Sequence, residues 1–410
     1  MKLLQINVTA NWGSTGRIAE QIGQLVIAQG WESYIAYGRG PSVSDSRLIR
    51  IGSKWEIYWH VLMTRLFDRH GLASKRATKR FIEQIKEIQP DIIHLHNVHG
   101  YYLNYELLFN FLAEYNRPIV WTLHDCWPFT GHCAHFMEAN CMQWQTLCKR
   151  CPLKRDYPAS VLFSRSASNF MLKKRVVTGL KDLMKVVPVS DWLHELLNRS
   201  FMHEIPAHTI HNGIDMSVFV PRDTPSKYVQ NKDNRFVILG VASVWTASKG
   251  LDDFYKLRTM LPQENYAIVL VGVTEKQSVN LPKGIQGISR TENVDELAAL
   301  YSTADVFVNP TYADNYPTTN LEAMACGTPV ITYRTGGSPE SVTDETGLVV
   351  EQGNVEALVA AIKVVRCNGK EKYSAACRRR AESYFDKDKC YQQYVDMYKT
   401  IINEKNEVAR

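Results

Sequence analysis

Long apolar runs are absent from this sequence. No uncharged apolar segment approaches the roughly 20 residues that a membrane-spanning helix needs. The N-terminal stretch MKLLQINVTANWG holds only a short apolar run, which Gln5 and Asn7 interrupt, so it lacks the features of a secretory signal. Low-complexity tracts are missing too. These absences predict a globular cytoplasmic protein and leave peripheral contact with the inner membrane open.

The dinucleotide-binding pattern G-x-G-x-x-G is absent as well. The segment NWGSTGRIAEQIG places Gly13 and Gly16 at a different spacing, which argues against a nicotinamide or flavin site. Glycines let backbone amides approach a ligand, and the start of a helix favours anions. Candidate contacts for a phosphate or for sugar hydroxyls are therefore Gly13, Ser14, Gly16 and Arg17. A plain tight turn is the competing interpretation.

What is present is an ordinary globular composition over 410 residues, with 45% hydrophobic and 22% charged residues. A chain of this length favours two domains, each able to bury a core of its own. Two domains predict a cleft between them, and ligands bind in clefts.

Positive charge is concentrated in the first half of the chain. Residues 1–195 contain 24 Lys and Arg against 16 Asp and Glu, a net charge of +8, whereas the remainder carries 24 against 26, or −2. The runs KRATKR (75–80) and LKKR (172–175) contribute to the excess. They predict a basic surface that meets anionic lipid or a phosphate-bearing acceptor, with ordinary solvated helix faces as the alternative. No nucleic-acid partner is expected.

Apolar, β-branched runs alternate with helical patterns in both halves. The first half contains KLLQINV, SYIAYG, DIIHLHN, PIVWTLHD and KVVPVS, and the second contains FVILGVASV, YAIVLVG, DVFVNPT, PVITYR and GLVV. This order predicts an α/β protein with two parallel sheets covered by helices. The predicted domains are 1–204 with a Cys-rich insertion at 126–151, 205–384, and a terminal helix at 385–410 that crosses back to the first domain.

Ligands of parallel sheets bind beyond the carboxyl ends of the strands, so residues at those ends are candidates. His124 follows the run PIVWTL, where a histidine can donate to a phosphate or to a sugar hydroxyl. The adjoining Asp125 is suited to holding a partner, although a lone His-Asp pair is more often structural. Ser243, Lys249 and Gly272 follow strands of the second domain, and Lys249 can neutralise a diphosphate there.

The segment DNYPTTNLEAMACGTPVIT is the most informative. Thr318 or Thr319 can cap a helix whose first amides cradle an anion, so the candidate donor-binding residues of this segment are Tyr316, Pro317, Thr318, Thr319 and Asn320. Glu322 has two interpretations. Thr319-Asn-Leu-Glu322 also fits a capping box, in which the glutamate bonds back to the cap, and periodicity alone favours that structural role.

Five of the nine cysteines lie between residues 126 and 151. In a reducing cytoplasm such crowding suggests a metal rather than disulfides. The C-x2-C pair is typical of zinc, and a structural site of four thiolates would take Cys133, Cys141, Cys148 and Cys151. Free thiols or redox pairing are the alternatives. His94, His96 and His99 favour hydrogen bonding at the strand end over metal binding.

These residues together resemble the retaining glycosyltransferases of family 4, which have the GT-B fold. The resemblance rests on DNYPTTNLEAMACGTPVI, followed by TGGSPESV and TGLVV, with support from HNGID (211–215), KG (249–250), PVS (188–190) and LHD (123–125). It covers nearly the whole chain in order. GSTGRIAEQIG and HDCWPFTGHC look like the bacterial exopolysaccharide and capsule subgroup of the colanic-acid type.

The resemblance implies two facing Rossmann-like domains with an interdomain cleft, an acceptor on the first and a nucleotide-diphosphate sugar on the second. It also implies transfer with retention and no metal or other cofactor in catalysis. Glu322 matches the second acid of the family's E-x7-E element, which holds the ribose hydroxyls, and Asp314 stands where the first acid lies near the transferred sugar. Lys249 matches the lysine on the diphosphate, and His124 the histidine near the reacting centre.

Two departures from the family pattern stand out. Asp314 is shorter by one methylene than the glutamate that the family has there. The family arginine that partners the lysine is missing, because Ser243 and Val244 occupy its place. Phosphate charge must then be met by Lys249, by the helix N-terminus, or by another basic residue such as Arg17 or Arg334.

The predicted function is transfer of a hexose from a nucleotide-diphosphate sugar, UDP rather than GDP, to a hydroxyl of a saccharide acceptor, lipid-linked in surface polysaccharide biosynthesis. Two alternatives stay open. One is a related epimerase that acts on the donor alone. The other is a catalytically weak module that binds a nucleotide sugar or a membrane.

Overall fold

A computed structural model describes residues 1–40, 43–229 and 235–408. The chain forms two compact units, the first comprising Met1–His211 and Tyr391–Arg410 and the second Asn212–Cys390. The division therefore falls a few residues beyond the predicted boundary at 204. Helix α13 (Lys387–Val408) begins in the second unit and from Tyr391 onwards belongs to the first.

The first unit is built on a six-stranded parallel sheet with the order β3-β2-β1-β4-β5-β6. Apart from the edge strand β3, its strands are buried over most of their length, as expected for a sheet covered on both faces. Their bounds are β1 (Lys2–Asn7), β2 (Glu32–Tyr37), β3 (Arg47–Arg50), β4 (Ile92–Leu95), β5 (Ile119–Leu123) and β6 (Met184–Pro188).

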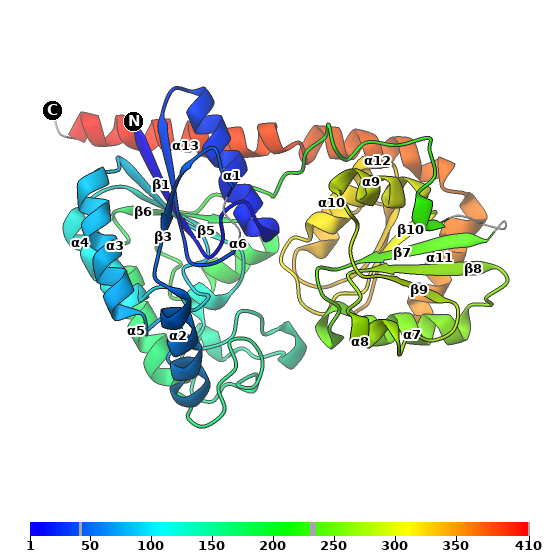
Figure 1. Cartoon of the computed structure of the whole chain (residues 1–410), viewed down its shortest axis with the longest axis horizontal. Helices are drawn as coiled ribbons and strands as arrows, with labels where there is room; N and C mark the ends of the chain where they lie inside the picture. Colours follow the sequence, from blue (N-terminus) through cyan, green and yellow to red (C-terminus); the bar gives the residue numbers. More distant parts are fainter. Residues whose placement is uncertain (41–42, 230–234, 409–410) are drawn as a thin grey trace. The chain divides into compact units, whose positions relative to one another are not determined.

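Helices cover both faces of this sheet, because each parallel connection must cross over with a right-handed turn. Helices α3, α4 and α5 pack side by side on one face, while α1 packs on β1 and β2 from the other (Figure 1). The helices are α1 (Gly13–Ala28), α2 (Lys54–Phe67), α3 (Lys75–Ile88), α4 (Tyr105–Tyr115), α5 (Ser166–Thr178) and α6 (Asp191–Asn198).

Helix α13 is attached to the first sheet by buried tyrosines. Tyr398 Oη lies 2.6 Å from His94 Nδ1, and Thr122 Oγ1 donates to Tyr394 Oη at 3.0 Å. Both tyrosines are almost fully buried. The C-terminal helix is thus part of the core of the first unit.

The second unit repeats this architecture with a parallel sheet of order β12-β11-β10-β7-β8-β9. Its strands are β7 (Phe236–Val241), β8 (Tyr266–Val271), β9 (Ile285–Ile288), β10 (Val306–Asn309), β11 (Val330–Tyr333) and β12 (Gly347–Val350). Helices α9, α10 and α12 lie along one face, and α7, α8 and α11 along the other (Figure 1). Their bounds are α7 (Leu251–Met260), α8 (Glu275–Ser278), α9 (Val294–Thr303), α10 (Thr318–Ala325), α11 (Val355–Asn368) and α12 (Glu371–Tyr384).

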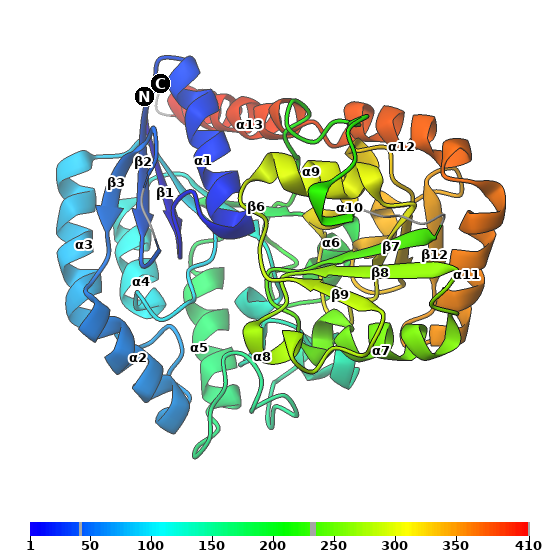
Figure 2. The same cartoon turned by 45° about the vertical axis from the view of Figure 1, so that its right-hand side comes forward.

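The sequence patterns missed one strand in each sheet, β3 and β9. Both are edge strands of four residues (Figure 2). An edge strand is half solvated, so RLIR and IQGI carry polar residues and lack a continuous apolar run.

The Cys-rich insertion forms short 3-10 turns, η1 (Trp127–Phe129), η2 (Met137–Ala139) and η3 (Gln143–Gln145). Further 3-10 turns in the chain are η4 (Lys227–Val229), η5 (Ala247–Lys249) and η6 (Ser338–Ser341). Among the described residues, none of the helices combines the length and apolar character needed to cross a bilayer.

Candidate active site

The strand order of the second unit brings Lys249 and Asp314 together. Lys249 follows β7 and Asp314 follows β10, and these neighbouring strands flank the point where the strand order reverses. Open α/β sheets bind ligands at such a point. Lys249 Nζ donates to Asp314 Oδ2 at 2.7 Å and to the Ala313 carbonyl at 3.4 Å. Both side chains are partly exposed, so the pair can exchange partners with a ligand.

Close backbone contacts fix the loops that carry this pair. Gly250 has φ of 77°, and a Cβ there would lie 2.2 Å from the Pro310 carbonyl oxygen. Gly336 has φ of 54°, and its Cβ would lie 1.8 Å from the Asp314 carbonyl oxygen. Only glycine allows both the left-handed backbone and the approach. The loops after β7, β10 and β11 are therefore packed against one another.

Asp253 on α7 stabilises these loops through hydrogen bonds to two tyrosines. Its Oδ2 accepts hydrogen bonds from Tyr312 Oη at 2.7 Å and from Tyr333 Oη at 2.9 Å. Burial and the Asp253 carboxylate raise the pKa of Tyr312 to about 12, and the same causes raise the pKa of Tyr333. Both phenols thus stay protonated donors that hold the start of the segment containing Asp314.

Helix α10 begins at Thr318, and its N-cap is Pro317, with no side-chain hydrogen bond to the cap. The expected threonine cap is therefore wrong, since Thr318 and Thr319 already stand inside the helix. Proline is tolerated at such a helix start because it has no N–H to satisfy. The first amides of the helix lack a side-chain acceptor from the cap, which suits an anion.

Asn320 lies inside the unit and is fully buried. Its Oδ1 accepts from Asn309 Nδ2 at 2.8 Å, and its Nδ2 donates to Ser338 Oγ at 3.1 Å and Ser341 Oγ at 3.2 Å. This network connects α10 to β10 and η6. The predicted donor-binding Asn320 thus positions the helix through protein contacts. Tyr316 is also buried, and its carbonyl accepts from Asn212 Nδ2 at 3.3 Å.

Glu322 forms no capping box, because Thr319 is not the cap of α10. Its carboxylate is buried and accepts a hydrogen bond from Tyr301 Oη at 2.9 Å. Periodicity favoured a capping role for Glu322, and that prediction is wrong. Tyr301 on α9 was missed by the sequence analysis, and no local pattern connects it to Glu322.

Thr335 follows β11 closely and begins TGGSPESV, one of the segments on which the family resemblance rests. Its Oγ1 is buried and has no hydrogen-bond partner among the described residues. Buried hydroxyls are normally paired, so this atom is a candidate ligand contact.

The position of the missing arginine is exposed, with Val244 at 52% exposure and Ser243 beside it. Arg334, one candidate to replace that arginine, pairs with Glu351 at 2.8 Å, and because both side chains are exposed its role toward the phosphates stays a prediction. Gly272 lies at the end of β8, where a Cβ would lie 1.8 Å from the Ala242 carbonyl oxygen.

In the first unit, the loop after β1 leads directly into α1. Gly13 begins the helix with φ of 68°, and Asn11, also in the left-handed region, donates from its amide to the Gly16 carbonyl at 3.1 Å. Ser14 and Arg17 are exposed, whereas Gly16 is buried against Thr9. The candidate loop is thus an exposed helix start at the carboxyl end of the sheet.

His124, at the end of β5, belongs to a chain of hydrogen bonds. Gln5 Nε2 donates to the Ala19 carbonyl, so Gln5 Oε1, 3.0 Å from His96 Nε2, accepts. His96 Nδ1 lies 3.1 Å from His124 Nε2. Burial lowers the pKa of His96 well below its usual range and that of His124 to about 4.

These neutral rings have defined tautomers. Because His96 donates through Nε2, its Nδ1 accepts, and His124 must donate through its own Nε2. The remaining nitrogen of His124 is then an acceptor. That His124 contacts a phosphate or a sugar hydroxyl stays a prediction, and this tautomer makes the second ring nitrogen an acceptor.

Asp125, which the sequence analysis proposed to hold a partner, pairs with His99. His99 Nε2 lies 2.8 Å from Asp125 Oδ2, and the Trp127 amide donates to Asp125 Oδ1 at 2.9 Å. Burial alone would raise the pKa of Asp125, but His99 and these hydrogen bonds lower it to about 2.

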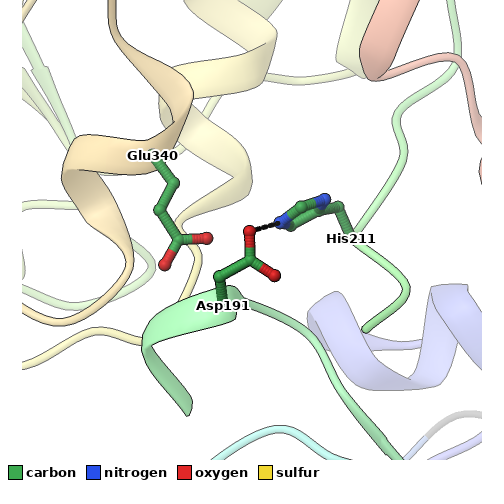
Figure 3. A group of neighbouring side chains, drawn as sticks. All are labelled: Asp191, His211 and Glu340. Atoms are coloured by element: carbon green, nitrogen blue, oxygen red, sulfur yellow. Dashed lines mark ion pairs between the residues drawn. The ribbon is translucent and has the colours of Figure 1, made fainter. Parts of the chain in front are cut away.

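A looser ion pair joins His211 to Asp191 at the start of α6, at 4.0 Å (Figure 3).

The Cys-rich insertion gathers all four predicted zinc ligands around one small cavity in the first unit.

Lys173, part of the predicted basic run 172–175, is not on the surface. Its Nζ is buried and donates to the Trp127 carbonyl at 2.6 Å and the Thr130 carbonyl at 2.9 Å. That run therefore contributes less surface charge than expected.

Two Rossmann-like units, each with candidate residues at the carboxyl edge of its sheet, are the architecture of GT-B glycosyltransferases. Solved structures share it. Sucrose-phosphate synthase of Thermosynechococcus elongatus matches with a TM-score of 0.73 and 18% identity, over 98% of this chain and 99% of that one. Anabaena HepE, solved with UDP-glucose, matches with a TM-score of 0.65 and 15% identity, over 98% and 100%.

Family models agree with the fold. The model described as Glycosyltransferase Family 4 matches residues 15–218, and the model described as Glycosyl transferases group 1 matches residues 235–367. Together these segments take in most of the chain, and the protein belongs to the family 4 glycosyltransferases of the GT-B fold.

Curated relatives are distant. WcaC of Escherichia coli strain K12, named as a colanic acid biosynthesis glycosyl transferase, is 24% identical over 88% of this chain and 90% of its own length. CapM of Staphylococcus aureus, named as a capsular polysaccharide biosynthesis glycosyltransferase, is 25% identical over 47% of this chain and 54% of its own length.

Proposed function

We propose that this glycosyltransferase moves a hexose, with retention, from UDP-hexose to a hydroxyl of a lipid-linked saccharide during surface polysaccharide biosynthesis. The observation that carries the donor assignment is the Lys249–Asp314 pair at the point where the strand order reverses. The names of WcaC and CapM support the pathway, and the UDP-glucose complex of HepE supports the donor.

In this proposal Lys249 leaves Asp314 and binds the diphosphate, while Asp314 turns to the hydroxyls of the transferred sugar. The amides at the start of α10 add positive potential at the distal phosphate. Glu322, oriented by Tyr301, accepts from the ribose hydroxyls. These groups together stabilise the charge of the departing diphosphate without a metal ion.

The acceptor oxygen then bonds to the anomeric carbon from the face that the diphosphate leaves, and the hydroxyl proton passes to the departing diphosphate. A neutral His124 accepts a hydrogen bond from a saccharide hydroxyl near the reacting centre, as its tautomer permits. The exposed loop from Gly13 to Arg17 is proposed to contact the sugar and the acceptor.

A membrane contact is proposed for the aromatic surface of α2, consisting of Trp55, Tyr58, Trp59, Leu62 and Phe67. Trp55 is 81% exposed and Trp59 57% exposed. The adjoining Val161, Leu162 and Phe163 are exposed too, and Phe163 stacks on Phe67. Lys75 and Arg76 are exposed, and together with Trp55 and Trp59 they line an open groove of about 630 Å³. Aromatic rings beside cationic side chains fit the interface of an anionic bilayer, where a lipid-linked acceptor would lie.

The Lys249→Met variant tests the donor site. Loss of a charged hydrogen bond costs about 1.5 to 3 kcal/mol, so UDP should bind about 10- to 100-fold more weakly by calorimetry. The thermal midpoint should change little, because a half-exposed ion pair contributes at most about 1 kcal/mol. Lys227→Met is the matched control, since Lys227 pairs with Glu296 on the surface of the same unit. Unchanged UDP affinity in Lys249→Met would refute the assignment.

Transfer itself is tested by incubating UDP-sugars with lipid-linked saccharides and measuring released UDP and the anomeric configuration of the product. Asp314→Asn should keep UDP affinity, because it removes a negative charge near the diphosphate, yet lower transfer. An epimerised donor in the absence of acceptor would favour an epimerase instead. Binding without release for every acceptor would favour a non-catalytic module.

A further inference from the structure

We propose that the Cys-rich insertion of the first unit binds one zinc ion through the thiolates of Cys133, Cys141, Cys148 and Cys151, with His132 as a positioning residue. All five side chains line one cavity, enclosed by Phe136 and Trp144. The cavity measures about 10 Å³, which is at the lower limit for a single water molecule. It can take an ion and excludes a small-molecule substrate.

His132 supplies an observation that does not depend on the cysteines. Its ring is buried, and Nδ1 lies 2.6 Å from Asp68 Oδ1. Nε2 is also buried and has no hydrogen-bond partner within the part of the chain that the structure describes. In metal sites a carboxylate commonly orients a histidine whose other nitrogen faces the metal. The Asp68 contact therefore marks this cavity as a metal site, and His132 is the alternative to Cys141 as the fourth ligand.

Polar groups lie beside some of the sulfurs. The Gly131 amide donates to Cys148 Sγ at 3.3 Å, and the thiols of Cys133 and Cys151 neighbour each other. The buried Lys173 Nζ also lies close to Cys148 and Cys133, and its hydrogen bonds go to the Trp127 and Thr130 carbonyl oxygens.

The sulfurs are not yet at ligand spacing, because no three of these metal-ligating atoms lie within 4.8 Å of one another in the described residues. A zinc ion binds sulfur at about 2.3 Å, so metal binding would draw the turns η2 and η3 inward. Cys141 and Cys151, the two partly exposed members, would move most. Since the insertion continues from His124 and Asp125, the ion would also fix the loop that begins at this candidate histidine.

The test is metal analysis of the full chain purified with zinc supplied. We expect one zinc per chain, its loss in Cys148→Ser and Cys151→Ser, and its retention in Cys367→Ser, which removes an exposed cysteine of the second unit. Cobalt in place of zinc should give the intense thiolate-to-metal absorption of four sulfur ligands. His132→Gln should keep one zinc but release it to a chelator about 10- to 100-fold more readily.

These measurements remain decisive if the serine variants fail to fold, because the wild-type chain with cobalt counts the thiolates. A metal-free wild-type chain whose four thiols react freely in excess zinc would overturn the proposal. A disulfide between Cys133 and Cys151 in place of metal would overturn it in favour of a redox pair. Retention of zinc by Cys141→Ser together with its loss from His132→Gln would overturn the four-thiolate ligand set.

Discussion

Acidification should unfold the two units at different pH values, because all 12 histidines precede residue 212 and so lie in the first unit. Burial lowers the pKa of five of them. The pKa of His60 falls to about 3 and that of His124 to about 4, while His70, His94 and His96 fall well below the usual range. The second unit contains no histidine.

The direction in which the free energy of unfolding changes with pH follows from proton binding. Below a pH of about 6.5 the unfolded chain protonates each of these histidines while the folded chain does not, so the free energy of unfolding falls as pH decreases. The loss is about 1.4 kcal/mol per pH unit for each histidine, or about 2 kcal/mol at pH 5. All five histidines shift in the same direction, so their effects on the free energy of unfolding of the first unit reinforce one another.

Tryptophan fluorescence can follow this transition, because eight of the nine tryptophans lie in the first unit and only Trp245 lies in the second. Thermal scans between pH 7.5 and 5 should show the fluorescence midpoint falling steeply. Calorimetry on the same samples should show a second transition that moves less. His60→Gln should flatten the dependence of the first unit on pH, whereas His203→Gln, at an exposed position, should leave it unchanged.

Equal shifts of both transitions over this pH range would refute the reasoning. So would a fluorescence midpoint that stays constant down to pH 5, since it would mean that the buried rings accept protons without cost. Reversal of the loss on return to pH 7.5 distinguishes titration from aggregation.

Three further substitutions test the packing that supports the site. Gly250→Ala should weaken UDP binding and lower the thermal midpoint, because the left-handed backbone alone costs about 1 to 2 kcal/mol and the new Cβ meets the Pro310 carbonyl. Tyr301→Phe should destabilise the second unit in calorimetry by about 1.5 to 3 kcal/mol, because it removes a hydrogen bond to the buried Glu322 carboxylate. The matched Tyr228→Phe removes a hydrogen bond to Glu296, a residue that still pairs with Lys227 near the surface, and should cost less than about 1 kcal/mol. Tyr398→Phe should lower the fluorescence midpoint of the first unit, because His94 Nδ1 loses its partner on α13.

Much of the architecture was predictable because it depends on short-range patterns. Apolar runs such as FVILGV and YAIVLV are long enough to identify buried parallel strands without any partner. The candidate positions of Lys249 and Asp314 were predictable too, since each directly follows such a run. The edge strands β3 and β9 were not, because partial solvation removes the apolar signal.

The sequence by itself thus determined two parallel α/β sheets and the residues that end their strands. Only the tertiary structure decided which of these residues meet. The adjacency of β7 and β10 brings Lys249 to Asp314 across 65 positions, and that of β1 and β4 brings Gln5 to His96 across 91. The pairing of Tyr301 with Glu322 likewise replaced the capping box that local spacing favoured. Hydrophobic periodicity acts over a few residues, whereas these contacts depend on strand order and crossover direction, which no local pattern encodes.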